Sequence, residues 1–144
     1  MGQVIVNINL INLSDLMLKR AGARKAAPRT VAVDALVDTG ATGLYLKPSI
    51  IKKLGLQPVE KIVSRTTNGR VERNKYEEVR MELMGRRDAF QVVEIPEDVP
   101  NLIGQIPLES LDFVVDPKRQ RLIGNPEHGG IQMTEIFGST LEYL

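Results

Sequence analysis

Residues 30–37 form an alternating, valine-rich stretch that runs directly into Asp38-Thr39-Gly40. Alternation with a period of two is typical of a β-strand that buries one of its faces. Asp, Thr and Gly favour a tight turn, and Gly also allows another backbone to approach closely. The stretch therefore predicts an acidic side chain at the exit of a strand, a position from which it can reach into a cleft.

The same alternation recurs along much of the chain and predicts a mainly β fold. The stretch from Val4 to Leu10 alternates and ends near residues 12–15, as a strand entering a turn does. Further strands, arranged as hairpins, are expected at 62–66, 71–83, 89–95, 113–115 and 121–123, with turns at Asn68-Gly69, Gly85-Arg86 and 116–118.

Two short helices interrupt the strands. Residues 46–54 carry apolar side chains at helical spacing, with Pro48 near the start and Gly55 just past the end, so they predict a helix. A second short helix is expected at 107–111. Residues 19–29 are basic, small and aperiodic, and we predict a solvated loop or hairpin end there.

The composition excludes several classes of function. The chain has 144 residues, a usual size for one domain, and carries 19 Lys and Arg against 18 Asp and Glu. So balanced a charge favours neither nucleic acid nor an anionic membrane as a partner. Cysteine is absent, which removes disulfides, thiolate nucleophiles and cysteine-bound zinc. No stretch approaches the ~20 apolar residues of a membrane span, and we expect a cytoplasmic protein.

We expect a single domain over residues 1–144, with a core at about 4–124 and a tail at 125–144. The tail is rich in apolar side chains, which seldom remain in water, so we predict that it makes a dimer contact. These apolar residues are Ile131, Met133, Ile136, Phe137, Leu141 and Tyr143.

A weak internal repeat points to the same dimer. Residues 36–40, followed by the predicted helix at 46–54, are echoed by Leu102-Ile103-Gly104 followed by residues 107–111. The second copy lacks an acidic residue. One chain would then hold half of a two-carboxylate site, and a twofold dimer would complete it.

Hydrolysis of an amide by carboxylates alone requires two of them, close enough to share a proton. When they lie about 3 Å apart they cannot both ionise, so one acts as a base on water while the other donates a proton to the carbonyl oxygen. Asp38 would supply one such carboxylate per chain.

Other interpretations of these acidic residues are simpler. Asp38-Thr39-Gly40 could be a turn without chemistry, and Asp34 with Asp38 could suggest phosphoryl transfer, although no Gly-rich phosphate loop or metal cluster accompanies them. His128, the sole histidine, lies beside Gly129-Gly130, and we predict a surface residue rather than a catalyst or metal ligand.

The sequence around Asp38 resembles the retropepsin-like aspartic peptidases, and it is closest to their bacterial single-domain members. The resemblance spans roughly residues 4–124 and includes Asp38-Thr39-Gly40-Ala41-Thr42, the Leu54-Gly55-Leu56 helix end, a flap hairpin and Leu102-Ile103-Gly104. It implies the acid protease fold, a closed β-barrel with one or two short helices, and an obligate homodimer with half a site per chain.

The resemblance also implies roles for individual residues. Asp38 matches the catalytic acid, Thr39 the hydroxyl that interlocks across the twofold axis, and Gly40 the catalytic turn. The residues implied to contact substrate are Ala41, Thr42, Thr66, Thr67, Asn68, Gly69, Arg70, Leu102 and Ile103, and no metal or cofactor is implied.

Two departures from the viral members occur together. These enzymes usually carry an acid directly after the Ala and an Arg after the last Gly, whereas this chain has Thr42 and Gln105, so both halves of an expected ion pair are replaced. The flap region carries Arg65, Arg70 and Arg73. These arginines either form a solvated strand face or favour acidic side chains in the substrate.

The sequence therefore predicts an aspartic endopeptidase in which two Asp38 carboxylates, one from each chain of a homodimer, activate a water against a peptide bond. The alternative is a dimeric peptide-binding module that keeps the fold without cleaving.

Overall fold

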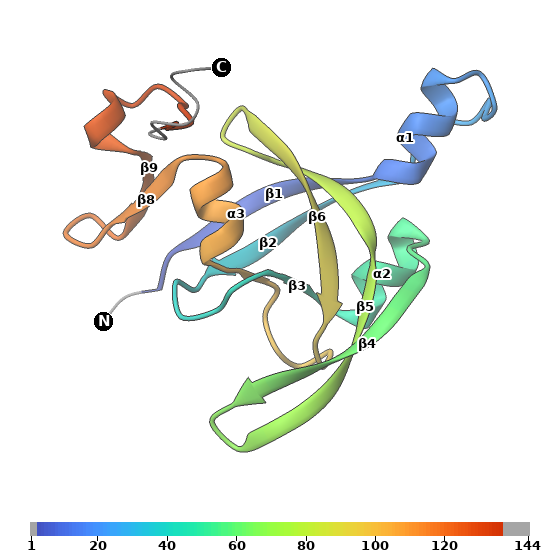
Figure 1. Cartoon of the computed structure of the whole chain (residues 1–144), viewed down its shortest axis with the longest axis horizontal. Coiled ribbons are helices and arrows are strands. Elements are labelled where there is room, and N and C mark those ends of the chain that lie inside the picture. Colours follow the sequence, from blue (N-terminus) through green and yellow to red (C-terminus); the bar gives the residue numbers. More distant parts are fainter. Residues whose placement is uncertain (1–2, 137–144) are drawn as a thin grey trace.

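The structure, a computed structural model, describes residues 3–136, and β-strands dominate it (Figure 1). The strands are β1 (Ile5–Asn12), β2 (Thr30–Val37), β3 (Leu44–Leu46), β4 (Pro58–Thr66), β5 (Gly69–Leu83), β6 (Arg86–Glu94), β7 (Leu102–Ile103), β8 (Phe113–Asp116) and β9 (Arg121–Gly124). The helices are α1 (Leu13–Arg20), α2 (Pro48–Leu54) and α3 (Gln105–Ser110), and a 3-10 turn covers Pro126–His128.

The large sheet closes on itself. Its strands run in the order β1-β2-β7-β3-β6-β5-β4, and β1 also pairs with β5, so six strands form a ring while β4 pairs with β5 outside it. β2 pairs with β7 and β3 with β6 in parallel, and the other pairs are antiparallel. The predicted mainly β, closed-barrel fold is confirmed.

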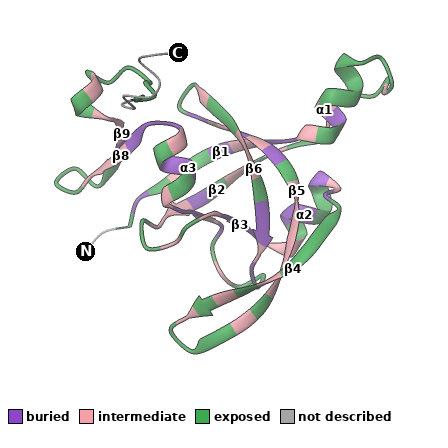
Figure 2. Cartoon of the chain, in the orientation of Figure 1, coloured by how far each residue is buried: buried purple, intermediate pink, exposed green. Residues whose placement is uncertain are grey.

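Buried and more exposed residues alternate along strands of the ring (Figure 2). In β5 the buried residues Val79, Met81 and Leu83 are separated by residues that reach solvent, which is the period of two expected of a half-buried strand. The largest fully buried side chains are Ile8, Leu10, Leu44, Leu46, Leu54, Val79, Met81, Leu83, Val92, Ile103, Leu108 and Leu111. The interior is therefore a packed apolar core, and a functional site has to lie outside it.

The predicted helix before Gly55 is confirmed. α2 begins with Pro48 at its first turn and ends at Gly55, whose φ of 64° is a conformation that glycine adopts without strain. A side chain at Gly55 would also collide with Arg29, since its Cβ would lie 1.9 Å from the Arg29 Nη1 atom. Both the positive φ and the close approach of Arg29 require glycine at this position.

The predicted hairpins are present; the turns of the β4–β5 and β5–β6 hairpins lie one residue earlier than expected, and that of the β8–β9 hairpin lies later, at 117–120. Thr66 pairs with Gly69, so Thr67 and Asn68 form the loop between β4 and β5. Leu83 pairs with Arg86, and the loop residues Met84 and Gly85 both have positive φ, 50° and 82°. Positive φ at both central residues is the signature of a type I′ hairpin turn.

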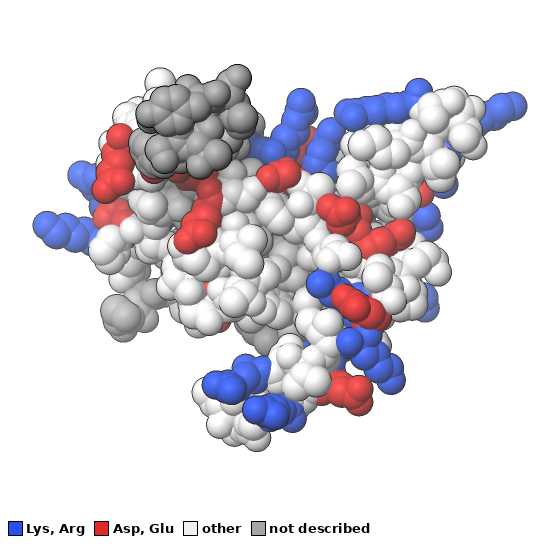
Figure 3. All heavy atoms as spheres, in the orientation of Figure 1, with Lys and Arg blue, Asp and Glu red and all other residues white. Residues whose placement is uncertain are grey.

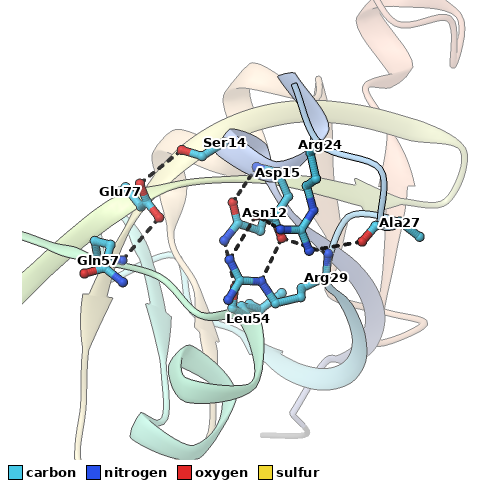
Figure 4. A network of polar contacts seen from close by, with 9 residues as sticks. All are labelled: Asn12, Ser14, Asp15, Arg24, Ala27, Arg29, Leu54, Gln57 and Glu77. Carbon is cyan, nitrogen blue, oxygen red and sulfur yellow. Dashed lines mark hydrogen bonds and ion pairs between the residues drawn. The ribbon is translucent and has the colours of Figure 1, made fainter. Parts of the chain in front are cut away.

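The segment after β1 differs from the prediction. Instead of a turn and a wholly solvated loop, residues 13–20 form α1, which projects with the following loop away from the barrel (Figure 1). Asn12 caps this helix, its Oδ1 accepting from the backbone N–H of Asp15 at 3.0 Å. Arg24 and Arg29, from the segment predicted as solvated, both pair with Asp15 (Figure 4). The physical reason is that α1 buries a carboxylate, which needs cationic partners from the loop.

The C-terminal hairpin is joined to the barrel through Arg86. The predicted β8–β9 hairpin is confirmed, and the Arg86 guanidinium stacks on the ring of Phe113 at 4.5 Å from its centroid. Arg86 also donates to the carbonyl oxygens of Leu111, Asp112 and Gly130, at 2.9, 2.8 and 2.6 Å. One side chain thereby holds two backbone segments, at residues 111–112 and at Gly130.

The predicted tail contact remains a prediction. Ile131, Met133 and Ile136 are exposed by 64%, 46% and 70% in the described chain, which leaves them available to a partner. Phe137, Leu141 and Tyr143, which belong to the same prediction, lie outside the described residues.

Candidate active site

Asp38 follows β2 directly and begins the turn at 38–41. Its backbone N–H donates to the carbonyl oxygen of Ile103 at 2.9 Å, and its own carbonyl accepts from the N–H of Ala41 at 3.1 Å. The carboxylate Oδ1 accepts from the backbone N–H of Gly40 at 2.9 Å. Asp38 is partly buried, while Thr39 and Gly40 are exposed. The main chain therefore fixes Asp38, and most of the carboxylate's hydrogen-bonding capacity stays open.

The segment after β7 supports this turn through backbone hydrogen bonds. The N–H groups of Gly104, Gln105 and Ile106 donate to the carbonyl oxygens of Gly43, Ala41 and Thr42, at 2.7, 2.8 and 3.0 Å. The predicted packing of Leu102-Ile103-Gly104 beside the turn is confirmed in the geometry. Glycine at 104 is a steric requirement, because a Cβ there would lie 2.6 to 2.7 Å from backbone atoms of Ala41 and Thr42.

Thr42 stands where viral members carry an acid, and it has a neutral partner here. Its hydroxyl lies 3.1 Å from the hydroxyl of Tyr45, which also accepts from the backbone N–H of Gly43 at 3.4 Å. Sequence reasoning did not single out Tyr45 for this role. The spacing of three residues across the turn was a signal that it could reach back to Thr42.

A cleft of about 1210 Å³ separates the Asp38 turn from the β4–β5 hairpin. Asp38 and Gly40 line it on one side, and residues 62–67 of the hairpin line it on the other. Its apolar lining includes Ile62, Phe90, Val93, Ile95, Leu102 and Ile106. An acidic side chain and apolar walls in one open groove suit an extended peptide.

The cleft brings together part of the predicted substrate-binding set. Five of these residues line it, namely Ala41, Thr42, Thr66, Thr67 and Leu102. Asn68, Gly69 and Arg70 lie farther along the hairpin end and do not line it. Ile103 is fully buried, with 0% exposure, and supports the turn through its carbonyl oxygen.

The competing interpretation through Asp34 gains no support from its position. Asp34 lies on an exposed face of β2, where its carboxylate accepts from the Asn7 side-chain amide at 3.2 Å, and it does not line the cleft. Among residues 3–136 no group of three or more His, Asp or Glu side chains could hold a metal ion.

The prediction that His128 is a surface residue was wrong. Its side chain is only 10% exposed and lies between two carboxylates, with Nδ1 2.6 Å from Asp112 Oδ2 and Nε2 in contact with Glu135. The hydrogen bonds to Glu135 and then Asp112 raise the pKa of His128, and the one from His128 lowers the pKa of Asp112. Asp112 is far from His128 in sequence, so the cluster fastens the segment after β9 and is separate from the cleft.

A comparison with models of protein families shows which family the chain belongs to. The model described as aspartyl protease matches residues 29–124, two thirds of the chain. The chain belongs to the aspartyl protease family. This match confirms the resemblance to retropepsin-like enzymes, and it contains the Asp38 turn, the β4–β5 hairpin and the segment after β7. Helix α1 and the 3-10 turn lie outside the matched range.

Family membership indicates a peptidase with a peptide substrate. Among curated proteins, none matched the chain. Within residues 3–136 no helix is long and apolar enough to cross a membrane.

Proposed function

We propose that this protein is an aspartic endopeptidase whose active site forms when two chains bring their Asp38 turns together. The observation that carries the proposal is the position of Asp38, which opens on a peptide-sized cleft from a turn that the segment after β7 holds by three backbone hydrogen bonds. The related turn at residues 102–104 carries no acid. One chain therefore offers one such carboxylate, and the chemistry needs two.

The two carboxylates would share the work of activating water and carbonyl. The ionised Asp38 takes a proton from water as the water oxygen attacks the carbonyl carbon, and the protonated Asp38 of the second chain donates to the carbonyl oxygen. A proton then passes to the amide nitrogen, and the C–N bond breaks. Thr39 is exposed beside Asp38, which leaves its hydroxyl free to bond across the twofold axis.

The substrate would lie extended between the turn and the hairpin. β4 pairs only with β5 and forms one side of the cleft, so its backbone can hydrogen-bond an added strand. Apolar residues along the cleft then accommodate alternate side chains. These contacts need no second carboxylate, which is why a dimeric peptide-binding module is the second candidate.

Cleavage of a diverse peptide library separates the two candidates. The native chain and Asp38→Asn are assayed between pH 3 and 8 at several protein concentrations, with circular dichroism and sedimentation to establish fold and association. We expect cleavage that requires Asp38 and rises more steeply than linearly with concentration while monomers predominate. A folded dimer of the native chain that cleaves nothing in the library would favour the binding module.

A further inference from the structure

Strand register determines which residues of the β4–β5 hairpin face the cleft. Ile62 pairs with Arg73 and Ser64 pairs with Val71. Residues directly opposite each other in an antiparallel pair point to the same face. Ile62 and Ser64 are partly buried and line the cleft, so the partly buried Arg73, which also lines it, shares their face.

The other two arginines of the hairpin lie on its opposite face. Arg65 pairs with Arg70, both are exposed, and their neighbour Val63 is 64% exposed. Arg65 reaches the rim of the cleft, and Arg70 does not line it. In Figure 3, Lys and Arg side chains gather over the end of this hairpin at the bottom of the view. Val63 and Arg65 also line the cleft but are exposed, so Arg73 is the one of the three arginines that is partly buried on the face shared with Ile62 and Ser64.

Arg73 forms no ion pair or side-chain hydrogen bond within residues 3–136, unlike two other partly buried cations of β5. Lys75, two residues along the same strand, pairs with Glu60 at 3.7 Å, and Arg80 pairs with Glu82 at 3.3 Å. A partly buried guanidinium that lacks a partner favours an anion in the cleft, because desolvation weakens its hydration without replacing it.

The charges around the cleft agree with this. The cations that line it are Arg65, Arg73 and Lys75, and the lining carboxylates are Asp38 and Glu78. Lys75 already has Glu60, and Asp38 is assigned to the chemistry under the proposed function. Arg65 and Arg73 are thus the lining cations without an ion pair within residues 3–136, and of these two only Arg73 is partly buried.

We propose that Arg73 selects peptides that carry an Asp or Glu side chain among apolar residues, an inference that rests on the proposed peptidase function. The planar guanidinium fork matches a carboxylate in a two-bond geometry that neither an amide nor a hydroxyl reproduces. Apolar neighbours such as Ile62 and Ile95 in the cleft strengthen that contact by excluding water.

Binding to the Asp38→Asn chain tests the inference without cleavage. The probes are fluorescein-labelled octapeptides of Val, Leu and Phe in which a single Glu, Gln or Lys is moved through the positions, and fluorescence anisotropy measures their dissociation constants. At the best position we expect Glu to bind about 10-fold more tightly than Gln, as a charge-assisted hydrogen bond provides, and Lys to bind most weakly. The Glu preference should shrink as salt is raised.

Variants made in the same background assign the preference to Arg73. Arg73→Gln should abolish it, and Arg73→Lys, which keeps the charge without the fork, should keep part of it. Lys61→Gln is the matched control, since Lys61 is an exposed cation of the same hairpin that does not line the Asp38 cleft. An equal Glu preference in Arg73→Gln and Lys61→Gln would overturn the inference, as would no Glu preference at any position.

The two proposals fail in different ways. Cleavage by the native chain without any acidic preference would refute the role of Arg73 and leave the peptidase standing. Arg73-dependent binding of acidic peptides without cleavage would refute the peptidase and support the acidic selectivity of the cleft.

Discussion

Asp15 and Asp38 differ in how many hydrogen bonds and ion pairs their carboxylates form. Asp15 is 3% exposed, and its oxygens accept from the Arg29 backbone N–H, Nε and Nη2 at 3.0, 2.8 and 2.9 Å, with Arg24 3.5 Å away (Figure 4). The Arg29 side-chain bonds are the main cause that lowers the pKa of Asp15 to about 2. Asp38 accepts one hydrogen bond, from Gly40, and forms no ion pair within residues 3–136. A fully bonded carboxylate stabilises the fold, whereas one with free lone pairs is available for chemistry.

The sharpest test of this contrast exchanges each carboxylate for an amide. Asp38→Asn should lower kcat/KM by on the order of 10³-fold or more, since the amide cannot act as the base, and should leave the thermal unfolding temperature nearly unchanged. Peptide cleavage and calorimetry on the same samples measure both. A variant that still cleaves as the native chain does would refute the role of Asp38.

The packing of Gly104 against the Asp38 turn can be disrupted by a substitution that leaves the Asp38 carboxylate in place. Gly104→Ala places a methyl group against the backbone of residues 41–42, and we expect a loss of about 1–3 kcal/mol in unfolding free energy together with reduced cleavage. Gly43→Ala is the matched control, because a Cβ there meets nothing within 4 Å. Urea unfolding of both variants measures the difference, and equal stabilities would contradict the steric argument.

Removing the Asp15 charge should have the opposite profile to Asp38→Asn. Asp15→Asn is expected to lower the unfolding free energy by about 2 kcal/mol at pH 7 while cleavage per folded molecule is retained. Because the folded pKa lies below the ordinary aspartate value of 3.8, this stability is present above pH 3.8 and is lost as pH falls toward 2. Asp98→Asn, at an exposed position, is the control. Denaturant titrations at pH 7 and pH 2.5 check both parts, and a deficit as large at pH 2.5 as at pH 7 would refute the linkage.

The pair of Asp112 and His128 is a third case, and its removal should change the stability of the fold least. Pairing raises the pKa of His128 from 6.5, so its contribution is complete below pH 6.5 and is lost as pH rises through the folded pKa. Pairing lowers the pKa of Asp112 from 3.8, so that contribution is present above pH 3.8 and is lost on acidification. The cluster should stabilise most between these values.

His128→Gln tests that window. The melting temperature of the native chain should exceed that of the variant most near pH 5 and least near pH 9, as measured by differential scanning fluorimetry in matched buffers. A constant difference across this range would show that His128 acts through packing alone.

The elements that sequence predicted well are those whose signals are local. The strand before Asp38 is defined by its alternation, and α2 by Pro48 and Gly55 at its two ends. Residues 102–104 were matched to a position beside the Asp38 turn through the family resemblance, and backbone hydrogen bonds confirm that position.

The features that the sequence did not predict depend on contacts between residues that are distant along the chain. Among the residues of α1 only Asp15 is buried, although Leu13, Leu16 and Met17 have helical spacing and Asn12, three residues before Asp15, was a capping signal. His128 owes its burial to Asp112, with which no local pattern connects it. The hairpin turn was placed one residue late, which shifts the pairing of β4 with β5 by two residues, so the sequence would have put Arg73 opposite Ser64 instead of Ile62 while leaving it on the same face.

The parallel pairing of β2 with β7 has a consequence for the order in which the molecule is made. Leu36 meets Leu102 and Val37 meets Ile103, so part of the support of the turn that begins at Asp38 comes from residues synthesised much later. A nascent chain that has emerged only as far as β6 carries Asp38 without the carbonyl oxygen of Ile103 or the N–H groups of residues 104–106. Non-local contacts of this kind form late in folding. The turn at Asp38 would therefore gain these hydrogen bonds only after residues 103–106 have left the ribosome.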